Sequence, residues 1–247
     1  MKVTFLTYNI HRAIGVDRRF RIERVAEILR HHDADIALLQ EVDEGAPRSR
    51  ELNLAHELAE LAGYDHHALG HNVSLRKGRY GNATLSRFPI VRERNIDLTI
   101  GRRKRRGCQH TTILVPGSNG TAEALEVFNL HLGLSAQERH EQIGVLLRSP
   151  EFHALPLQAP CVVGGDFNDW RSLLLPVFTL ALGFDCATYM EESGRALRTF
   201  PAFAPRGALD RLYVRGNLRT LRCHASRLRV ARVASDHLPV VAELELV

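Results

Sequence analysis

The sequence predicts an α/β fold in which two β-sheets pack against each other and are flanked by helices. Short apolar runs rich in β-branched residues recur along all 247 residues, and about four segments between them show helical spacing instead. No internal repeat, low-complexity tract or linker rich in Pro, Gly or Ser interrupts the chain. Because 45% of the residues are hydrophobic, the chain can bury a sizeable core. We therefore expect a single domain over residues 1–247.

The first half of the chain is expected to form two helices, at residues 21–31 and 52–61, set among strands. The earlier helix is indicated by apolar residues at helical spacing between Ile22 and Leu29. The run 35–39 is a short buried strand that ends abruptly in two polar residues. The remaining strands expected in this half are 3–9, 82–86, 91–98, 111–115 and 124–131.

The second half is expected to hold one long helix and five strands. The helix, at residues 136–147, begins after Ser135, and Glu138 three residues further on completes the sequence pattern of a capping box. A buried strand at 159–163 runs into a Gly-Gly-Asp sequence that ends at Asp166. The other strands expected are 209–214, 218–224, 227–233 and 238–246.

Nothing in the sequence indicates a membrane span or a secretion signal. No apolar run approaches the ~20 residues that a spanning helix needs. Residues 1–11 lack the apolar segment and cleavage site of a signal peptide, and they suit a first strand. The cysteines are scattered without a CxxC pair, so we expect reduced, buried thiols at Cys108, Cys161, Cys186 and Cys223. We therefore expect a cytoplasmic monomer with no stable membrane insertion.

The charge balance points to a polyanionic partner. The formal net charge is +5 and the isoelectric point is near 9.3, with arginine rather than lysine supplying the excess. Arginine suits phosphate because its planar group can donate two hydrogen bonds at once. This balance fits nucleic acid or an anionic lipid surface and does not choose between them.

Polar residues follow the apolar runs at several places, where their side chains can point into a shared cleft. These residues are Asn9, Glu41, His131, Asp166 with Asn168, Asp210, and Asp236 with His237. The three carboxylates of Glu41, Asp166 and Asp236 repel one another unless a cation lies among them. Oxygen ligands, with the amides of Asn9 and Asn168 beside them, suit Mg²⁺ or Mn²⁺ better than zinc, so we expect one or two such ions.

The two histidines of this set can carry out proton chemistry or stabilise charge on a phosphoryl oxygen. His237 needs an acid to fix its tautomer, and Asp210 is the candidate. Taken alone, each residue of the set also has an ordinary explanation. Asn9 could cap a turn, Glu41 could be a solvated loop acid, and His131 could be a satisfied interior histidine. Their joint position at strand ends favours a shared site.

The ordered motifs of the chain resemble those of the endonuclease/exonuclease/phosphatase superfamily. The matching segments span nearly the whole chain: ThrTyrAsnIleHis at 7–11, LeuGlnGluVal at 39–42, GlyAsnAlaThrLeuSerArgPhePro at 81–89, AsnLeuHisLeu at 129–132, GlyGlyAspPheAsnAsp at 164–169, LeuAspArgLeuTyr at 209–213 and SerAspHisLeuProVal at 235–240. The resemblance implies the fold of deoxyribonuclease I, a four-layer α/β sandwich of two mostly antiparallel sheets packed face to face with helices outside. It also implies hydrolysis of a phosphoester by a metal-activated water.

The resemblance further implies a metal site. Glu41 would be the principal ligand of Mg²⁺ or Mn²⁺, with Asn9 and Asp236 nearby or coordinating directly or through water. Asp166 and Asn168 would orient the attacking water and could hold a second ion.

The resemblance also implies roles for the remaining residues. His237, oriented by Asp210, would act as base or phosphate stabiliser, and Asn82 would contact the phosphate. His131 falls where deoxyribonucleases and neutral sphingomyelinases have histidine and where abasic-site endonucleases have tyrosine. The carboxylate expected to partner His131 is not evident, since residues 77–80 read LysGlyArgTyr. An electrostatic role for His131 is therefore favoured over general acid catalysis.

A run of basic residues at 101–107 (GlyArgArgLysArgArgGly) is the densest charge in the chain. It could bind a polyanion through phosphate contacts, it could be a solvated hairpin tip, or Arg105 or Arg106 could reach the scissile phosphate, of which Arg106 is preferred. No aromatic residues are interleaved with these arginines, which disfavours stacking on a single strand. The segment 200–203 (PheProAlaPhe) could insert into a bilayer, but we expect its rings to pack beside Asp210.

Three functions remain open at the level of sequence. A Mg²⁺-dependent nuclease or general phosphodiesterase is favoured by the arginine surplus and the complete set of motifs. A phospholipid-headgroup phosphodiesterase or phosphatase, similar to sphingomyelinases, is the alternative. A non-catalytic binding protein on the same fold is disfavoured because no motif residue is missing. Nucleic acid is therefore expected as the partner in preference to a lipid headgroup.

Overall fold

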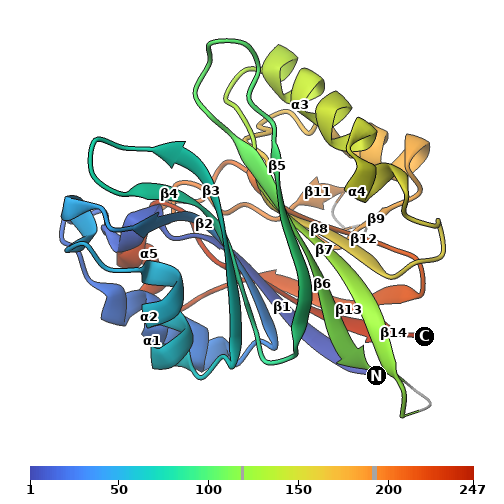
Figure 1. Ribbon diagram of the computed structural model, residues 1–247, viewed down its shortest axis with the longest axis horizontal. Helices are drawn as coiled ribbons and strands as arrows, with labels where there is room; N and C mark the ends of the chain where they lie inside the picture. Colours follow the sequence, from blue (N-terminus) through green and yellow to red (C-terminus); the bar gives the residue numbers. More distant parts are fainter. Residues whose placement is uncertain (118–119, 191–193) are drawn as a thin grey trace.

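The computed structural model describes residues 1–117, 120–190 and 194–247, and it contains two six-stranded β-sheets (Figure 1). The first sheet has the order β13 (Leu218–Ala225), β14 (Val240–Leu246), β1 (Lys2–Asn9), β2 (Ile36–Glu44), β4 (Arg79–Ser86) and β3 (His66–Ser74). The second has the order β5 (Ile90–Asp97), β6 (Gly107–Pro116), β7 (Ala122–His131), β8 (Cys161–Asp166), β12 (Asp210–Arg215) and β9 (Asp185–Cys186). β1 with β2 and β7 with β8 pair in parallel, and the other described neighbours in these sheets are antiparallel.

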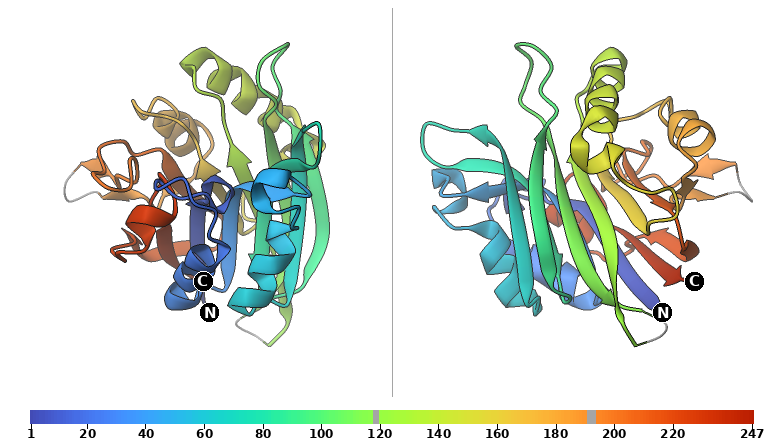
Figure 2. Two further views of the ribbon diagram at one scale, coloured as in Figure 1. Left: turned by 90° about the vertical axis from the view of Figure 1, so that its left-hand side faces the viewer. Right: turned by 45° about the vertical axis from the view of Figure 1, so that its right-hand side comes forward.

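Three apolar clusters separate four layers. The middle cluster lies between the sheets and contains Phe5 and Leu38 of the first sheet with Val127 and Leu212 of the second. The two outer clusters lie under the helices, which are α1 (Ile22–His32) and α2 (Leu54–Ala62) on the first sheet, and α3 (Ala136–Arg148) and α4 (Pro150–His153) on the second. Figure 2 shows the helices outside the two packed sheets. The predicted four-layer α/β sandwich of mostly antiparallel sheets is confirmed.

The alternation of side chains along each strand explains both the layers and the position of the polar residues. In β1, Val3 and Phe5 belong to the middle cluster, whereas Leu6 and Tyr8 belong to the cluster under α1 and α2. At one end of the sandwich the inward positions change from apolar to polar. The polar residues that end the inward series of β1, β7 and β8 are Asn9, His131 and Asp166.

The caps of the helices follow the sequence signals. Ser135 accepts a hydrogen bond from the backbone N–H of Glu138 at 3.2 Å, which caps α3 as predicted. The carboxylate of Glu138 instead contacts Gln142 and Arg103, so it ties the start of the helix to the loop after β5. The helix therefore begins where predicted and is anchored to a neighbouring loop.

The sequence expectations failed most clearly at three segments, and the short elements β9 and α4 were also missed. β3 was missed because His66–Ser74 holds histidines, Gly70 and few β-branched residues, and it forms only as an edge strand along β4. The expected strand 227–233 is a turn followed by α5 (Ala231–Ala234), since Val230, Ala231 and Ala234 pack at helical spacing. The strand expected at 35–39 does not stop before Glu41, because β2 continues to Glu44.

The four cysteines agree with the sequence prediction in part. All four cysteines are free, with Cys108 and Cys161 buried as expected and Cys186 and Cys223 only half-buried. Among the described residues, no helix has the length and apolar character to cross a membrane. The short helices η1 (His11–Ala13) and η2 (Pro47–Ser49) follow β1 and β2.

Candidate active site

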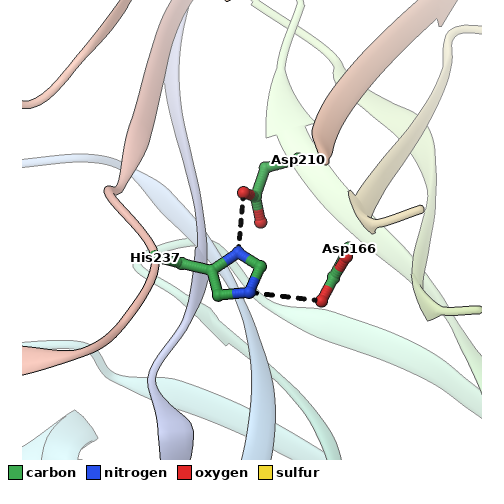
Figure 3. A group of neighbouring side chains, drawn as sticks. All are labelled: Asp166, Asp210 and His237. Carbon is green, nitrogen blue, oxygen red and sulfur yellow. Dashed lines mark hydrogen bonds and ion pairs between the residues drawn. The ribbon is translucent and has the colours of Figure 1, made fainter. Parts of the chain in front are cut away.

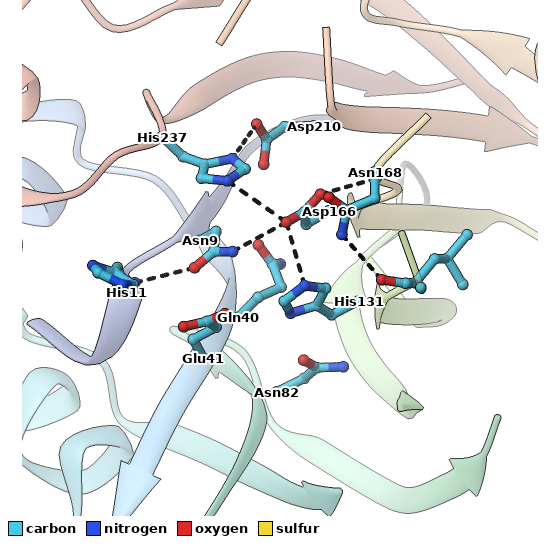
Figure 4. Close-up of polar contacts among 12 residues, drawn as sticks. Asn9, His11, Gln40, Glu41, Asn82, His131, Asp166, Asn168, Asp210 and His237 are labelled. Atoms are coloured by element: carbon cyan, nitrogen blue, oxygen red, sulfur yellow. Dashed lines mark hydrogen bonds and ion pairs between the residues drawn. The ribbon is translucent and has the colours of Figure 1, made fainter. Parts of the chain in front are cut away.

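The polar ends of several strands meet at one end of the sandwich. In the second sheet, Asp166 on β8 is the register partner of both His131 on β7 and Asp210 on β12. In the first sheet, Asn9 at the end of β1 is the register partner of Gln40 on β2. Because these positions face the space between the packed sheets, their side chains converge (Figure 4).

A buried chain of interactions links Asp210, His237 and Asp166 (Figure 3). Nδ1 of His237 lies 2.9 Å from Oδ2 of Asp210, and Nε2 lies 3.7 Å from Oδ2 of Asp166. The hydroxyl of Thr199 donates to the same oxygen of Asp210. Burial opposes a charged imidazole, but the carboxylates of Asp210 and Asp166 outweigh burial and raise the pKa of His237 to about 10. We call these three residues the relay: Nδ1–H of His237 is held by Asp210, and Nε2 is directed at Asp166.

Asp166 is the hub of the group. Its Oδ2 accepts a hydrogen bond from Nδ2 of Asn9 at 3.1 Å, and its Oδ1 accepts one from the backbone N–H of Asn168 at 3.0 Å. Asn168 has a left-handed φ of 50°, and its side-chain amide donates to the carbonyl of Leu132, which fixes the turn. Burial raises the pKa of Asp166 to about 6, although the positive charge of His237 opposes the rise. These contacts fix the orientation of the Asp166 carboxyl group, which can in turn orient a water molecule.

His131 lies on another side of Asp166, with its Nε2 3.4 Å from Oδ2 of that residue. This carboxylate is the one that His131 faces, in keeping with the lack of an acid at 77–80. Burial, together with the positive charges of Arg106 and His237, lowers the pKa of His131 well below its usual value. Arg106 is itself buried, and its Nε has no hydrogen-bond partner among the described residues. The site thus holds a neutral imidazole near a buried guanidinium.

Glu41 lies at a β-bulge within β2. The pairing of β2 with β4 shifts register between Leu39 and Val42, and Glu41 has a left-handed φ of 55°. The bulge places the Glu41 carboxylate on the side of Asn9 (Figure 4). Its Oε2 is buried and accepts no hydrogen bond within the described part of the chain, although Nε of Arg12 lies 3.5 Å away. A buried carboxylate oxygen without a donor costs free energy, which a bound cation would offset.

The segment 235–237 is tied to the end of β1. Oγ of Ser235 donates to the backbone carbonyl of Asn9 at 2.7 Å, and it accepts a hydrogen bond from the backbone N–H of His237 at 3.2 Å. Asp236, between them, is half-buried, and its Oδ1 lies 3.3 Å from Oγ of Ser235. These bonds hold Asp236 and His237 next to Asn9.

The donor set fits a hard divalent cation. Atoms of Asp166, Asp210 and His237 lie within 4.8 Å of one another, which is close enough to share an ion. In that group, however, Nδ1 of His237 and Oδ2 of Asp210 already bind each other. Two carboxylate oxygens of the site are buried without a hydrogen-bond donor among the described residues, Oδ1 of Asp210 and, on the opposite side, Oε2 of Glu41. Carboxylate and amide oxygens are the ligands that Mg²⁺ and Mn²⁺ prefer.

A frame of buried amides supports the site, and sequence reasoning did not assign two of its members, Gln40 and Asn129. Nε2 of Gln40 donates to Oδ1 of Asn129 at 2.8 Å, and Nδ2 of Asn129 donates to two carbonyls of the first sheet. Asn82 donates from Nδ2 to two carbonyls of the second sheet. The side chains of Asn129 and Asn82 therefore connect the two sheets by hydrogen bonds in both directions. Oδ1 of Asn82 lacks a partner among the described residues, so a contact with phosphate requires its amide to turn.

The missed residues differ in how they could have been found. Gln40 and Asn129 lie inside the motifs quoted above, and a buried amide at an inward strand position was the available signal. Thr199 carried no such signal, because it precedes Asp210 by eleven residues and meets it only in the folded chain.

Aromatic rings line one side of His237. The ring centroid of Phe200 lies 5.0 Å from that of His237, and the Trp170 ring lies 5.5 Å from Phe200. Phe200 therefore packs beside the Asp210–His237 pair as expected. The same expectation was wrong for Phe203, which is 68% exposed because the turn after Pro201 carries it outward.

The structure thus brings most of the predicted site residues into one group. Those joined to it by hydrogen bonds or ion pairs are Asn9, His131, Asp166, Asn168, Asp210 and His237. Glu41 and Asn82 lie beside them (Figure 4), Asp236 adjoins His237, and the charge of Arg106 acts on His131.

Comparison with known proteins identifies the family. A sequence model described as the endonuclease/exonuclease/phosphatase family matches residues 6–237. The chain belongs to this family. Members of the endonuclease/exonuclease/phosphatase family are phosphoester hydrolases, including phosphodiesterases and phosphatases, and they generally use divalent metals.

Relatives and solved structures agree with the membership. The chain is 34% identical over 249 residues to the uncharacterized protein YbhP of Escherichia coli, which covers 98% of this chain and 95% of that protein. A family structure from Beutenbergia cavernae has a TM-score of 0.82 at 24% identity, covering 99% of this chain and 72% of that one. The mannosyl-6-phosphatase Bt3783 of Bacteroides thetaiotaomicron has a TM-score of 0.74 at 21% identity, covering 98% and 99%. At these identities the two structures show the shared fold alone.

Proposed function

We propose that this chain is a divalent-metal-dependent phosphoesterase that hydrolyses a phosphodiester with water as the nucleophile. The observation that supports the proposal is the presence of two unlike sides in one site. On one side Asp210, His237 and Asp166 form a buried relay, and on the other Glu41 presents a carboxylate oxygen without a hydrogen-bond donor in the described chain. Hydrolysis of a charged phosphoester needs both a group that moves protons and a cation that neutralises charge.

The residues on the Glu41 side would hold the metal. Glu41, Asn9 and Asp236 are the proposed ligands of Mg²⁺ or Mn²⁺, and Asp166 with Asn168 would hold a second ion. When bound, the ion neutralises charge on the phosphoryl oxygens and lowers the pKa of a nearby water. The oxygen-only donor set supports this assignment.

The relay residues would handle the protons. Asp166 would orient the attacking water and accept its proton through Oδ2. His237, with Nδ1 held by Asp210, would present Nε2–H to a phosphoryl oxygen and stabilise the charge that develops there. His131 would contribute a neutral imidazole, and Arg106 would supply a fixed positive charge to the substrate phosphate, with Asn82 as a further contact once its amide turns.

The test uses the full chain with bis-p-nitrophenyl phosphate, a small soluble diester. We expect release of p-nitrophenol with Mn²⁺ or Mg²⁺ and none in EDTA. His237→Gln should lower kcat by about 10³-fold or more, because the relay is lost. His224→Gln, which changes an exposed histidine on β13, is the matched control and should leave kcat unchanged. Hydrolysis without metal, or a His237→Gln variant as active as the wild type, would overturn the proposal.

The substrate class follows from what surrounds the site. Hydrolysis of a monoester should be compared with hydrolysis of the diester, because the similar structure Bt3783 is by name a mannosyl-6-phosphatase. We expect the monoester p-nitrophenyl phosphate to be a poorer substrate than bis-p-nitrophenyl phosphate. The basic residues 101–107 support a polyanionic partner, nucleic acid or anionic lipid. Exposed apolar side chains near the site favour lipid over the nucleic acid preferred from sequence.

We also propose that residues 1–247 act as one domain and as a monomer in the cytoplasm. A single unfolding transition and the molecular mass in solution would test the first two parts of this proposal.

A further inference from the structure

Four loops around the candidate active site are joined to one another by direct contacts. The loop 101–106 meets the loop 131–135 where Nη1 of Arg103 donates to Oγ of Ser135 at 2.9 Å. The loop 131–135 meets the loop 166–174 through Arg139, whose guanidinium binds the carbonyl of Leu134 and the carboxylate of Asp169. The loop 166–174 meets the loop 199–207 where Trp170 packs on Phe200. Because these loops carry or adjoin His131, Asp166, Asp210 and Arg106, they form the rim of the site.

Three of these loops expose large apolar side chains. Leu134 is 73% exposed, Trp170 54%, Leu173 50% and Phe203 68%. We call these four side chains the rim surface. The Trp170 ring packs closely over Gly207, where a Cβ atom would lie 2.7 Å from the indole. Large apolar side chains exposed on connected loops around a site indicate a surface that meets an apolar partner.

The charge of the same loops has one sign. Their exposed charged residues are Arg102, Arg103, Lys104, Arg105, Arg171 and Arg206. Their two acids, Asp166 and Asp169, are both 1% exposed, so these four described loops present no carboxylate to the solvent. The partner is therefore expected to combine apolar character with negative charge.

We propose that the rim surface docks onto a membrane surface containing anionic phospholipid, and that the phosphoester hydrolysed belongs to a lipid headgroup. This inference rests on the phosphoesterase function proposed above. Apolar side chains flanked by arginines can enter the boundary between headgroups and acyl chains while the arginines pair with lipid phosphates. Single-stranded nucleic acid is the weaker fit, because Leu134 and Leu173 are aliphatic and offer no ring on which a base can stack.

Trp170 provides a direct test of docking, because it is the single tryptophan of the chain. In EDTA, vesicles of phosphatidylcholine with phosphatidylglycerol should shift its emission to the blue and protect it from acrylamide. Vesicles of phosphatidylcholine alone should do so less, since the arginines lose their partners. An unchanged emission with the mixed vesicles overturns the proposal. Quenching by oligothymidylate in place of any response to vesicles overturns it in favour of nucleic acid.

Variants separate the rim surface from the catalytic site. The triple variant Leu134→Ser, Leu173→Ser, Phe203→Ser should weaken sedimentation with mixed vesicles by at least ~10-fold, while hydrolysis of bis-p-nitrophenyl phosphate stays within about twofold. Leu157→Ser is the matched control, because Leu157 is 68% exposed and precedes β8 at the end opposite Asp166. A triple variant that sediments like the wild type overturns the proposal.

Hydrolysis of the lipid itself tests the second half of the inference. Wild type with Mn²⁺ should release headgroup from the mixed vesicles, and the triple variant should release it at least ~10-fold more slowly. A wild type that docks and cleaves bis-p-nitrophenyl phosphate but leaves the lipid intact overturns the lipid substrate. A wild type that docks but cleaves neither overturns the proposed function and leaves docking supported.

Discussion

The two sides of the candidate site differ in how far the protein itself holds them in place. On the relay side, Oδ2 of Asp210 receives hydrogen bonds from both His237 and Thr199, whereas its Oδ1 has no partner among the described residues. On the other side, Oε2 of Glu41 receives none from the described residues and has only Arg12 nearby. Protein contacts therefore hold His237 and Oδ2 of Asp210 in place, whereas the proposed cation would supply the contact that Oε2 of Glu41 lacks.

This contrast predicts that replacing a carboxylate by an amide has different effects on the two sides of the site. Replacing a carboxylate by an amide on the relay side removes a bond that the fold uses. The same replacement on the Glu41 side removes a charge that the fold leaves without a hydrogen-bond donor. Stability without metal and activity with metal should therefore respond differently on the two sides.

The largest effect is expected for Asp210→Asn. An amide at this position no longer stabilises an imidazolium at His237, so kcat on bis-p-nitrophenyl phosphate should fall by about 10³- to 10⁴-fold. Without metal, urea unfolding should show a loss of roughly 1–3 kcal/mol, because a charged, buried hydrogen bond is weakened. Asp185→Asn, on the neighbouring strand β9 and exposed, is the control for both measurements. Wild-type kcat in Asp210→Asn would remove the relay from the mechanism.

Glu41→Gln should affect the metal rather than the fold. The Mn²⁺ concentration that gives half-maximal activity is expected to rise about 10²-fold. The free energy of unfolding in EDTA should fall by less than in Asp210→Asn, because Glu41 loses an ion pair with Arg12 but no hydrogen bond. Metal should raise the Tm of the wild type, and this rise should be lost in the variant. Glu44→Gln, on the same strand, should keep the wild-type Mn²⁺ dependence. If Glu41→Gln destabilises the metal-free chain as much as Asp210→Asn, the two sides are not different in kind.

The relay side was the easier one to predict from sequence. Asp166 ends an apolar run whose side chains alternate, so its inward position follows from the period of a strand. The geometry of Glu41 could not be read in this way, because it depends on a bulge that forms only when β2 pairs with β4. The same limit explains Asn82, whose amide hydrogens are used by carbonyls of a sheet that the sequence does not place.

The rim was the least predictable region. The segment 200–203 was expected to pack as a unit, yet Phe200 lies against His237 while Phe203 faces solvent. A turn reverses the direction of successive side chains, and its geometry depends on contacts with Trp170 and Gly207 that lie outside the segment. Exposed apolar residues therefore appear as a group only in the folded chain.

A smaller effect is expected for Thr199→Val, which keeps the shape of the side chain but removes the hydroxyl that binds Asp210. The charge on Asp210 remains and His237 keeps its partner, so kcat should fall only about 10-fold. Stability should fall by about 1–2 kcal/mol, because a fully buried carboxylate oxygen loses a donor. Thr199→Ser, which keeps the hydroxyl, should recover most of kcat. If kcat falls as far in Thr199→Val as in Asp210→Asn, Thr199 contributes more than its hydrogen bond to Asp210.

The smallest effect is expected for His32, a half-buried histidine. Its ring contacts a hydroxyl group, whereas the ring of His237 lies between two carboxylates. Nε2 of His32 lies 2.8 Å from Oγ of Ser226. Burial, together with the charges of His31 and His224, lowers its pKa from 6.5 to about 4. Between these two pH values the unfolded chain binds a proton that the folded chain does not, so the free energy of unfolding falls as the pH falls.

His32→Gln should remove this contribution to the pH dependence. In urea unfolding in EDTA at pH 7, 6 and 5, the free energy of unfolding of the variant should rise relative to that of the wild type as the pH drops. The part of the pH dependence that comes from carboxylates is the same in both proteins. His153→Gln, at an exposed histidine of α4, should run parallel to the wild type. A constant gap between His32→Gln and the wild type would mean that His32 has the same pKa folded and unfolded. In that case the contrast between His32 and His237 would fail, because a histidine without a neighbouring carboxylate would show no lowered pKa.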